Sequence, residues 1–172
     1  IYSREKLAGL RGKKMQKKRN HIARFKDDPD WSYEPITKDN LAETRFMAHN
    51  WICSREEKWN EDMEDEFSVL EDAFANYDAL GLRGGILRQH GDIVAFTMGD
   101  PLNSDTFLVH FEKAFPEVQG AYPMINQQFV ENEWQSMTYI NREEDMGLEG
   151  LRKAKESYQP VKMISKYHAT LA

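Results

Sequence analysis

The sequence predicts an α+β fold in which a mixed, mostly antiparallel sheet is flanked by helices. Three observations lead to this prediction. Residues 37–80 carry apolar side chains at helical spacing, residues 82–113 contain three short strand patterns separated by turns, and residues 139–160 pass from a strand through a polar loop into a helix. At 172 residues the chain suits one domain, and such a domain can bury roughly 70% of the surface that its unfolded form exposes.

The N-terminal segment predicts an amphipathic basic helix from Ser3 to about Lys26. Its apolar residues share a helical stripe; they are Leu7, Leu10, Ile22 and Phe25. Gly9 and Gly12 weaken the helix by around 1 kcal/mol each relative to alanine. Residues 27–30 then end it, because Asp-Asp-Pro-Asp does not continue a helix. We therefore predict a basic linker helix at 1–28 and a folded domain at 29–172.

The domain itself is expected to run in a fixed order of strands and helices. A first strand spans Trp31–Ile36, and two helices follow, to about Trp59 and from Asp62 to Leu80. The next three strands form an antiparallel meander with a tight turn at His90-Gly91; they are Leu82–Gln89, Asp92–Met98 and Asp105–Lys113. In the third of these strands, Phe107, Val109 and Phe111 are predicted to face the core together, while His110 on the other face is interpreted as a structural histidine. A helix beginning near Pro123, a strand at Met137–Ile140, a helix after Gly147 and a last strand at Val161–Tyr167 complete the order.

Composition narrows the functional classes. Hydrophobic residues make up 40% of the chain and charged residues 30%, yet no apolar run approaches the ~20 residues of a membrane helix, and nothing resembles a signal peptide. The single cysteine, Cys53, excludes an internal disulfide, and the five histidines show no metal-ligand spacing. We therefore expect a cytoplasmic protein without a metal. Because the chain starts at Ile1 directly in a helical pattern, we also expect it to be the later part of a longer protein.

The net charge of −6 conceals an uneven distribution. Residues 1–26 hold ten Lys or Arg and one acid, whereas the remainder holds thirteen basic and twenty-eight acidic residues. Nine of those acids lie between Glu56 and Asp72. The basic segment therefore either meets an external anion or docks on this acidic surface, and both possibilities remain open.

The loop at residues 141–145 is the strongest candidate for chemistry. It places Asn, Arg and three carboxylates between a strand and a helix, which is a common position for functional residues in proteins with alternating strands and helices. The alternative is a solvated connection without a function.

The same region carries a resemblance. Tyr-Ile-Asn-Arg-Glu-Glu-Asp at 139–145 and Gly-Leu-Arg-Lys-Ala-Lys-Glu-Ser-Tyr-Gln-Pro at 150–160 resemble the C-terminal half of bacterial proteins related to the phosphatidylglycerol lysyltransferase catalytic domain. Members of that group have GNAT-like acyltransferase folds and are relatives of the Fem peptidyltransferases. The predicted element order is also the GNAT order. The resemblance implies that the strands at 105–113 and 137–140 splay apart and admit an acyl donor, either acyl-CoA or aminoacyl-tRNA.

One departure from the GNAT pattern concerns the donor site. Acetyl-CoA enzymes of this fold carry Arg/Gln-x-x-Gly-x-Gly/Ala before the helix after the fourth strand, whereas this chain offers only Gln119-Gly120-Ala121, and Pro123 removes a backbone donor. This argues against a CoA pyrophosphate site. The backbone N–H groups at the helix start can still receive an anion, so the substrate-binding candidates here are Gln119, Gly120, Tyr122 and Asn126.

Aminoacyl transfer requires positioning of the substrates, removal of a proton and stabilisation of an oxyanion. The resemblance implies that Lys155 stabilises the oxyanion; the alternative is a solvated helix lysine. Asn141 is a candidate for orienting the donor carbonyl, Arg142 for clamping a phosphate or carboxylate, and Glu143 or Asp145 for accepting the proton. We expect two or three of these residues to form a local ion-pair network instead.

The basic segment supplies a second group of candidates. This segment resembles the helix that joins two GNAT-like halves in members of the family. The resemblance implies that a tRNA or a phospholipid headgroup would lie near it. The candidates are Arg11, Lys13, Lys14, Lys17, Lys18 and Arg19. The expected partner is the preceding GNAT-like half of the same protein or a second copy.

Two functions follow from these observations. The first is acyl transfer, specifically from an aminoacyl-tRNA-type donor to a lipid, peptide or small amine or hydroxyl acceptor. The alternative is a non-catalytic GNAT-like binding module. A donor pocket between the splayed strands would favour the first, and an opening filled by Phe or Tyr side chains the second.

Overall fold

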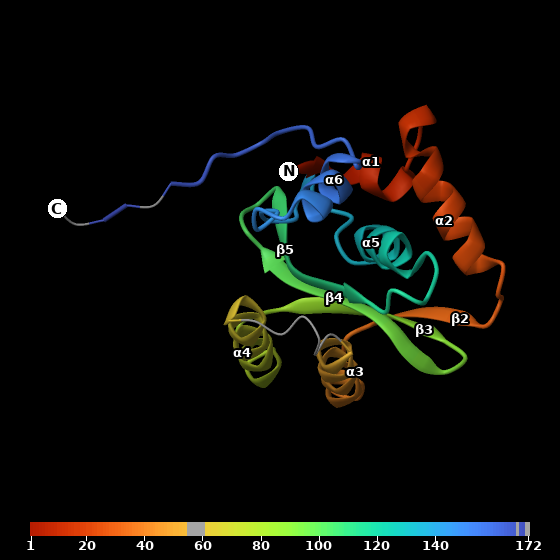
Figure 1. Ribbon diagram of the computed structural model, residues 1–172, viewed down its shortest axis with the longest axis vertical. Helices are drawn as coiled ribbons and strands as arrows, with labels where there is room; N and C mark the ends of the chain where they lie inside the picture. The colour runs from red at the N-terminus through yellow and green to blue at the C-terminus, as the bar shows by residue number, and fades with distance from the viewer. Residues whose placement is uncertain (55–60, 168, 171–172) are drawn as a thin grey trace.

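The computed structural model describes residues 1–54, 61–167 and 169–170. Its six-stranded sheet has the order β1-β6-β5-β4-β3-β2. The strands are β1 (Tyr2–Ser3), β2 (Trp31–Pro35), β3 (Arg83–Gln89), β4 (Asp92–Pro101), β5 (Thr106–Ala114) and β6 (Tyr139–Asn141). The helices are α1 (Arg4–Gly9), η1 (Lys13–Met15), α2 (Gln16–Lys26), α3 (Leu41–Cys53), α4 (Glu61–Ala75), α5 (Ala121–Asn132) and α6 (Glu149–Glu156). Figure 1 shows α1, α2 and α5 on one face of the sheet and α3 and α4 on the other.

Strand pairing confirms the predicted meander. β2, β3, β4 and β5 pair antiparallel in sequence, and His90 and Gly91 both have positive φ values, 54° and 87°, as a two-residue hairpin turn requires. β6 then pairs parallel to β5 and antiparallel to β1. The sheet is therefore mixed and mostly antiparallel.

Each face of the sheet has its own core. On the α5 side, buried residues include Phe107, whose ring stacks on Trp134 at 3.9 Å between centroids, and Phe129. On the other side, α3 and α4 pack against Ile86 and Phe96 of the central strands. Because the middle of the sheet is covered on both faces, its central strands are almost continuously apolar.

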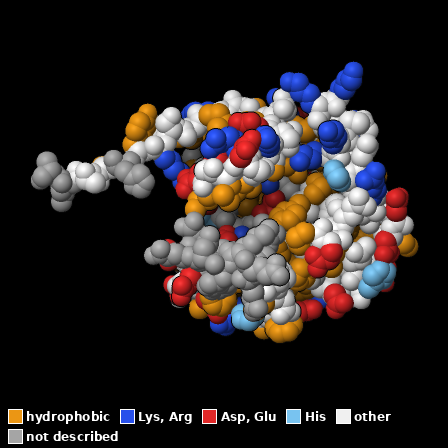
Figure 2. All heavy atoms as spheres, in the orientation of Figure 1, with side chains coloured by type: hydrophobic (Ala, Val, Ile, Leu, Met, Phe, Trp, Pro, Cys, Tyr) orange, Lys and Arg blue, Asp and Glu red, His pale blue; other side chains and the backbone are white. Residues whose placement is uncertain are grey.

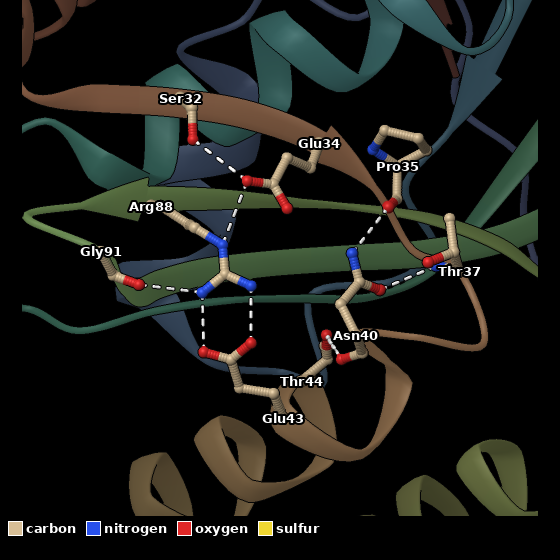
Figure 3. Close-up of polar contacts among 9 residues, drawn as sticks. All are labelled: Ser32, Glu34, Pro35, Thr37, Asn40, Glu43, Thr44, Arg88 and Gly91. Atoms are coloured by element: carbon tan, nitrogen blue, oxygen red, sulfur yellow. Dashed lines mark hydrogen bonds and ion pairs between the residues drawn. The ribbon is translucent and has the colours of Figure 1, made fainter.

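Arg88 joins α3 to the sheet (Figure 3). Its guanidinium donates to both carboxylate oxygens of Glu43 at 2.7 and 2.6 Å, to Glu34 at 3.1 Å and to the Gly91 carbonyl at 2.9 Å. A fork of this kind matches the two carboxylate oxygens in geometry as well as charge. Asn40 precedes α3, and its side chain shapes the turn before the helix by donating to the Pro35 carbonyl and accepting from the Thr37 amide.

The continuous helix predicted over Ser3–Lys26 is wrong. The segment forms β1, α1, η1 and α2 instead, with breaks at Leu10, whose φ is 43°, and at Gly12, whose φ is 93°. Arg19 closes the break by donating to the carbonyls of Leu10 and Gly12 at 2.5 and 2.8 Å. All four predicted apolar positions are nevertheless buried. The boundary between residues 28 and 29 stays a prediction.

Three other expectations need correction. Residues 161–167 form no strand. The Val161 amide donates to the Ile1 carbonyl, and the Ile1 amine donates to the Lys162 carbonyl. β1 is too short to pair with more of the segment, which runs away from the domain (Figure 1). The second predicted helix ends at Ala75 rather than Leu80, in a run of turns. The first ends at Cys53, and its expected end at Trp59 lies outside the described residues.

Candidate functional site

The candidate site lies where β5 and β6 separate. The two strands pair over three residues only, from Thr106 with Tyr139 to Leu108 with Asn141. β5 continues to Ala114, while the chain after Asn141 turns away into the loop that precedes α6. Figure 2 shows a hollow on this face, below α6, with acidic and basic side chains at its floor. The opening that the GNAT-like order implies is therefore present.

A β-bulge decides which side chains face this opening. Met98 pairs with Phe111 and Gly99 with Val109, so His110 is an extra residue in β5. Gly99 permits this arrangement, because a Cβ there would lie 1.9 Å from the Leu108 carbonyl oxygen. The bulge reverses the alternation: Phe107 and Val109 face the α5 layer, whereas Phe111 faces the α3 layer. The prediction that all three share one face is wrong, and Glu112 gains a position on the α5 side.

Glu112 forms the centre of a buried polar cluster. One of its carboxylate oxygens accepts from Arg142 Nη2 at 2.7 Å and the other from Asn126 Nδ2 at 2.8 Å. Arg142 and Glu112 are only 11% and 12% exposed in their side chains. Arg142 Nη1 and Asn126 Oδ1 are buried without a hydrogen-bond partner in the structure. Two buried polar atoms beside this ion pair thus lack a hydrogen-bond partner. Such atoms lower the stability of the folded state unless a ligand binds them.

Aromatic rings and a lysine from the N-terminal segment enclose Arg142. Its guanidinium lies 4.8 Å from the Tyr158 ring centroid and 5.7 Å from that of Tyr2, and Lys18 Nζ lies 4.1 Å from the Tyr158 ring. Burial and the nearby Arg142 lower the pKa of Lys18. Burial likewise disfavours charge on Arg142, but the Glu112 carboxylate and the two tyrosines outweigh it and raise the pKa of Arg142.

Lys155 approaches the same cluster from α6. Its Nζ donates to the carbonyls of Arg142 and Glu144 at 2.6 and 2.5 Å. Burial, followed by the charge of Arg142, lowers the pKa of Lys155. An ammonium group has three donors, so two fix the loop and one remains. The structure thus places Lys155 beside Arg142, while its role in catalysis stays a prediction.

The other loop candidates are held in local pairs. Glu143 contacts His110 Nδ1 at 3.0 Å, and His110 Nε2 contacts Asp100 at 2.9 Å. The hydrogen bond that Glu143 accepts from His110 is the largest cause that raises the pKa of His110. Asp145 accepts from Arg152 Nε at 2.5 Å, and this bond lowers the pKa of Asp145. Asn141 Oδ1 accepts from the Glu143 amide at 3.0 Å and so shapes the turn.

The start of α5 does not fit a CoA pyrophosphate. Gly120 has a φ of 88° and lies so close to α2 that a Cβ would be 2.2 Å from the His21 carbonyl oxygen. The Ala121 amide is already bonded to the Val118 carbonyl at 3.2 Å, and Pro123 has no N–H. Gln119 is exposed and Tyr122 is partly buried. Among the four candidates in this region, Asn126 is the one whose hydrogen bond to Glu112 is established.

The basic candidates divide into three kinds. Arg11, Lys13 and Lys17 are exposed, and Figure 2 shows Lys and Arg side chains gathered over α1 and α2. Lys14 and Lys18 reach the end of α6, through Gln159 at 3.0 Å and the Tyr158 ring. Arg19 is occupied by its own loop.

The alternative in which the basic segment docks on the acidic surface is wrong for the described residues. α1 and α2 pack against α5, whereas α4, which holds the described part of the acidic run, lies across the sheet beside α3 (Figure 1). Residues 56–60 of that run lie outside the described part of the chain.

Sequence reasoning missed Glu112, Tyr2 and Tyr158. The predicted alternation of this strand puts Glu112 on the face opposite Phe111, and the bulge across from Gly99 turns it toward the α5 side instead. Tyr2 and Tyr158 lie at opposite ends of the chain, with rings 6.5 Å apart in an edge arrangement. No helix in the described ranges is long and apolar enough to cross a membrane, and no group of acidic, His or Cys side chains there could hold a metal ion.

The sheet order and the opening between β5 and β6 define a GNAT-type domain, and known structures agree. The aminoglycoside acetyltransferase AAC(6')-Iy, solved with a CoA-containing bisubstrate analogue, is 12% identical and superposes with a TM-score of 0.54 over 82% of this chain and 99% of that one. The C-terminal domain of a lysylphosphatidylglycerol synthetase from Agrobacterium fabrum is 14% identical, with a TM-score of 0.59 over 88% of this chain and 52% of that one. At these identities the likeness shows the fold.

The chain belongs to the family described as phosphatidylglycerol lysyltransferase, C-terminal, whose model matches residues 1–170. A conserved protein of unknown function from Bacteroides thetaiotaomicron VPI-5482 is 50% identical, with a TM-score of 0.90 over 94% of this chain and 55% of that one. The chain spans about half the length of this protein and of an uncharacterized protein from Mycoplasmoides gallisepticum, to which it is 25% identical over 97% of its own length. Its family and fold are those of acyltransferases.

Proposed function

We propose that this domain takes part in aminoacyl transfer from an aminoacyl-tRNA-type ester to an amine or hydroxyl of a lipid, peptide or small molecule. The observation that supports it most is Lys155, held by two loop carbonyls beside the buried Arg142–Glu112 pair at the opening between β5 and β6. In the reaction the acceptor attacks the ester carbonyl, a new C–N or C–O bond forms, and the ester C–O bond breaks. The acceptor's proton leaves and the departing ribose oxygen takes one up.

The positions of the side chains suggest a role for each. Lys155 has one donor left for the developing oxyanion, in a partly desolvated place where such a donor is most effective. Arg142 has an unbonded Nη1 that can hold a phosphate or carboxylate oxygen. We assign proton acceptance to Glu143 rather than to Asp145, because the ion pair with Arg152 lowers the pKa of Asp145 and makes it the weaker base. Asn141 shapes the turn that positions Glu143.

The two tyrosine rings around Arg142 must be weighed against the alternative of a non-catalytic binding module. Tyr2 and Tyr158 do occupy part of the opening, as that alternative expects. They nevertheless leave charged groups in a buried place, where an unmatched donor is more typical of a binding site than of a packed core. We therefore retain catalysis as the proposal.

The poor fit for CoA favours a tRNA-type donor. Because α2 covers the start of α5, the anionic part of the donor would lie instead on the exposed cations Arg11, Lys13 and Lys17, next to Lys14 and Lys18. If six cations of the segment met phosphates of duplex RNA or DNA, log affinity would fall with log salt at a slope of about −5. An anionic lipid headgroup could use the same surface, and the partner half of the protein would supply the rest of the site.

The test is a transfer assay with the protein at its natural length, labelled aminoacyl-tRNAs and a panel of acceptors that includes phosphatidylglycerol vesicles. Lys155→Met should reduce transfer about a hundredfold or more, as loss of an oxyanion donor does. Lys153→Met is the matched control, because Lys153 lies on the same helix in an exposed pair with Glu149. Equal activity of both variants, or no transfer by the folded protein to any acceptor, would refute the proposal.

A further inference from the structure

A second cavity lies at the other edge of the sheet, where β2 ends and β3 begins. Its volume is about 310 Å³, at the lower end of the range for small-molecule sites. Both faces of the sheet contribute to its wall. The residues that matter for its chemistry are Ile36, Tyr77, Asp78, Arg83, Gly84 and Glu133.

Two consecutive glycines of β3 create this space. A Cβ on Gly84 would lie 2.5 Å from Ile36 Cδ1, and one on Gly85 would lie 2.2 Å from the Tyr33 hydroxyl. Without these side chains, Tyr33 can cross the strand and donate its hydroxyl to Glu133 at 3.1 Å. Glu133, which follows α5, is thereby fixed at the cavity, opposite Tyr77, which follows α4.

Three polar groups at the cavity retain capacity to bind a ligand. The Tyr77 hydroxyl is buried, the residue being 7% exposed, and it makes no well-formed hydrogen bond, although the Gly84 backbone amide approaches it. Glu133 has its bond from Tyr33 but no cation paired with it among the described residues, and Arg83 pairs with no carboxylate there. Arg83 lies instead 5.5 Å from the Trp134 ring centroid.

The charged groups at the cavity lie close enough to affect the pKa of the Tyr77 hydroxyl. Burial raises the pKa of Tyr77 and the nearby Gly84 backbone amide opposes this effect, while the Glu133 carboxylate adds to it and Arg83 opposes it. The second carboxylate, Asp78, is already paired with the exposed Lys38 at 3.2 Å. The cavity thus presents one fixed carboxylate, one guanidinium and one buried hydroxyl that are free to bind a ligand.

We propose that this cavity binds a small zwitterion, a free α-amino acid, with its ammonium group at Glu133 and Tyr77 and its carboxylate at Arg83. A ligand that carried only one charge would leave one of the two protein charges unmatched, whereas a zwitterion satisfies both. Hydrogen bonds between ionised groups are about twice as strong as neutral ones. This proposal does not depend on the acyl transfer proposed for the opening between β5 and β6.

Calorimetry and thermal shift with the whole protein test it, with glycine, L-alanine and L-lysine as probes and methylamine and acetate as single-charge probes. At least one amino acid should raise the melting temperature, and each single-charge probe should bind at least about tenfold more weakly. Glu133→Gln should weaken amino-acid binding about tenfold or more. The matched control is Glu131→Gln two residues earlier, in the last turn of α5, whose carboxylate contacts Gln128 instead, and it should bind as the unaltered protein does.

Tyr77→Phe separates binding from folding, because Glu133 also holds Tyr33. It removes only a hydroxyl that makes no well-formed hydrogen bond, so the stability of the unliganded protein should change little. Affinity for the amino acid should nevertheless fall about three- to tenfold. Unchanged affinity in this variant, equal binding of single-charge probes, or no binding of any amino acid would each overturn the proposal.

Discussion

Arg88 and Arg142 both bind carboxylates across secondary-structure elements, but they differ in how completely they are matched. Arg88 has four hydrogen bonds, including a fork to Glu43, and its partners Glu34 and Glu43 are 40% and 49% exposed. Arg142 has one bond to a Glu112 that is 12% exposed, and its Nη1 has no partner. The first arginine is matched by protein groups, as a structural residue should be.

The unbonded donor of Arg142 distinguishes a candidate binding site from a structural ion pair. A buried cation whose donors are only partly used destabilises the free domain, and it persists where a ligand completes it. Two further cations, Lys18 and Lys155, stand beside Arg142. Arg88 instead contacts two carboxylates and a backbone carbonyl (Figure 3). The comparison therefore separates a connection between α3 and the sheet from a candidate site.

The largest expected effect on stability comes from removing the carboxylates of the two pairs. Glu112→Gln leaves the buried Arg142 charge unpaired and should lower the free energy of unfolding by about 3–5 kcal/mol. Glu43→Gln is the comparison, and at that half-exposed position the loss should be about 1 kcal/mol. Urea unfolding of both variants measures the difference. Similar losses in the two variants would show that burial does not make the Arg142–Glu112 pair more important for stability than the Arg88–Glu43 pair.

The basic segment gives the next largest effect. Replacing Lys13, Lys14, Lys17 and Lys18 with Gln should weaken binding to tRNA and to anionic vesicles and flatten its salt dependence. Exposed pairs contribute about 0–1 kcal/mol each, so the melting temperature should fall by no more than several degrees.

A second variant separates Lys18 from the exposed lysines. Lys18→Gln alone should affect the site beside Tyr158, whereas the triple variant without it should affect anion binding and reduce the salt slope by about 3 if duplex phosphates are bound. Unchanged binding alongside a lower melting temperature in the quadruple variant would remove the substrate role of this segment.

His110 should give a smaller, pH-dependent effect. Its pKa is raised in the folded state, chiefly by the hydrogen bond with Glu143, so the stabilisation is complete below the unfolded value of about 6.5 and is lost as pH rises through the folded pKa. The loss should be about 1 kcal/mol or less for a partly exposed pair. Unfolding free energies of the protein and of His110→Gln across pH 6–9 measure it. The same pH dependence in both proteins would contradict this contribution of His110.

Local patterns predicted the sheet well and the site only in part. The His90-Gly91 turn gave the β3–β4 hairpin, and the resemblance at 139–160 directed attention to Lys155 and Arg142. Glu112 could not be found in this way, because its direction depends on one extra residue in β5 opposite Gly99. The break at Leu10 and the approach of Tyr2 to Tyr158 depend on tertiary packing, for which a local sequence pattern carries little information.

The most direct test of the account exchanges Arg for Lys at the two positions and measures both stability and transfer. Arg88→Lys loses the fork to Glu43 and should cost about 1–3 kcal/mol, or about 2–10 °C in melting temperature, while transfer changes less than about threefold. Arg142→Lys keeps the charge opposite Glu112 but loses Nη1, so transfer should fall about a hundredfold with a smaller change in melting temperature. The opposite pattern, with transfer retained in Arg142→Lys and lost in Arg88→Lys, would contradict the assignment of the site to the opening between β5 and β6.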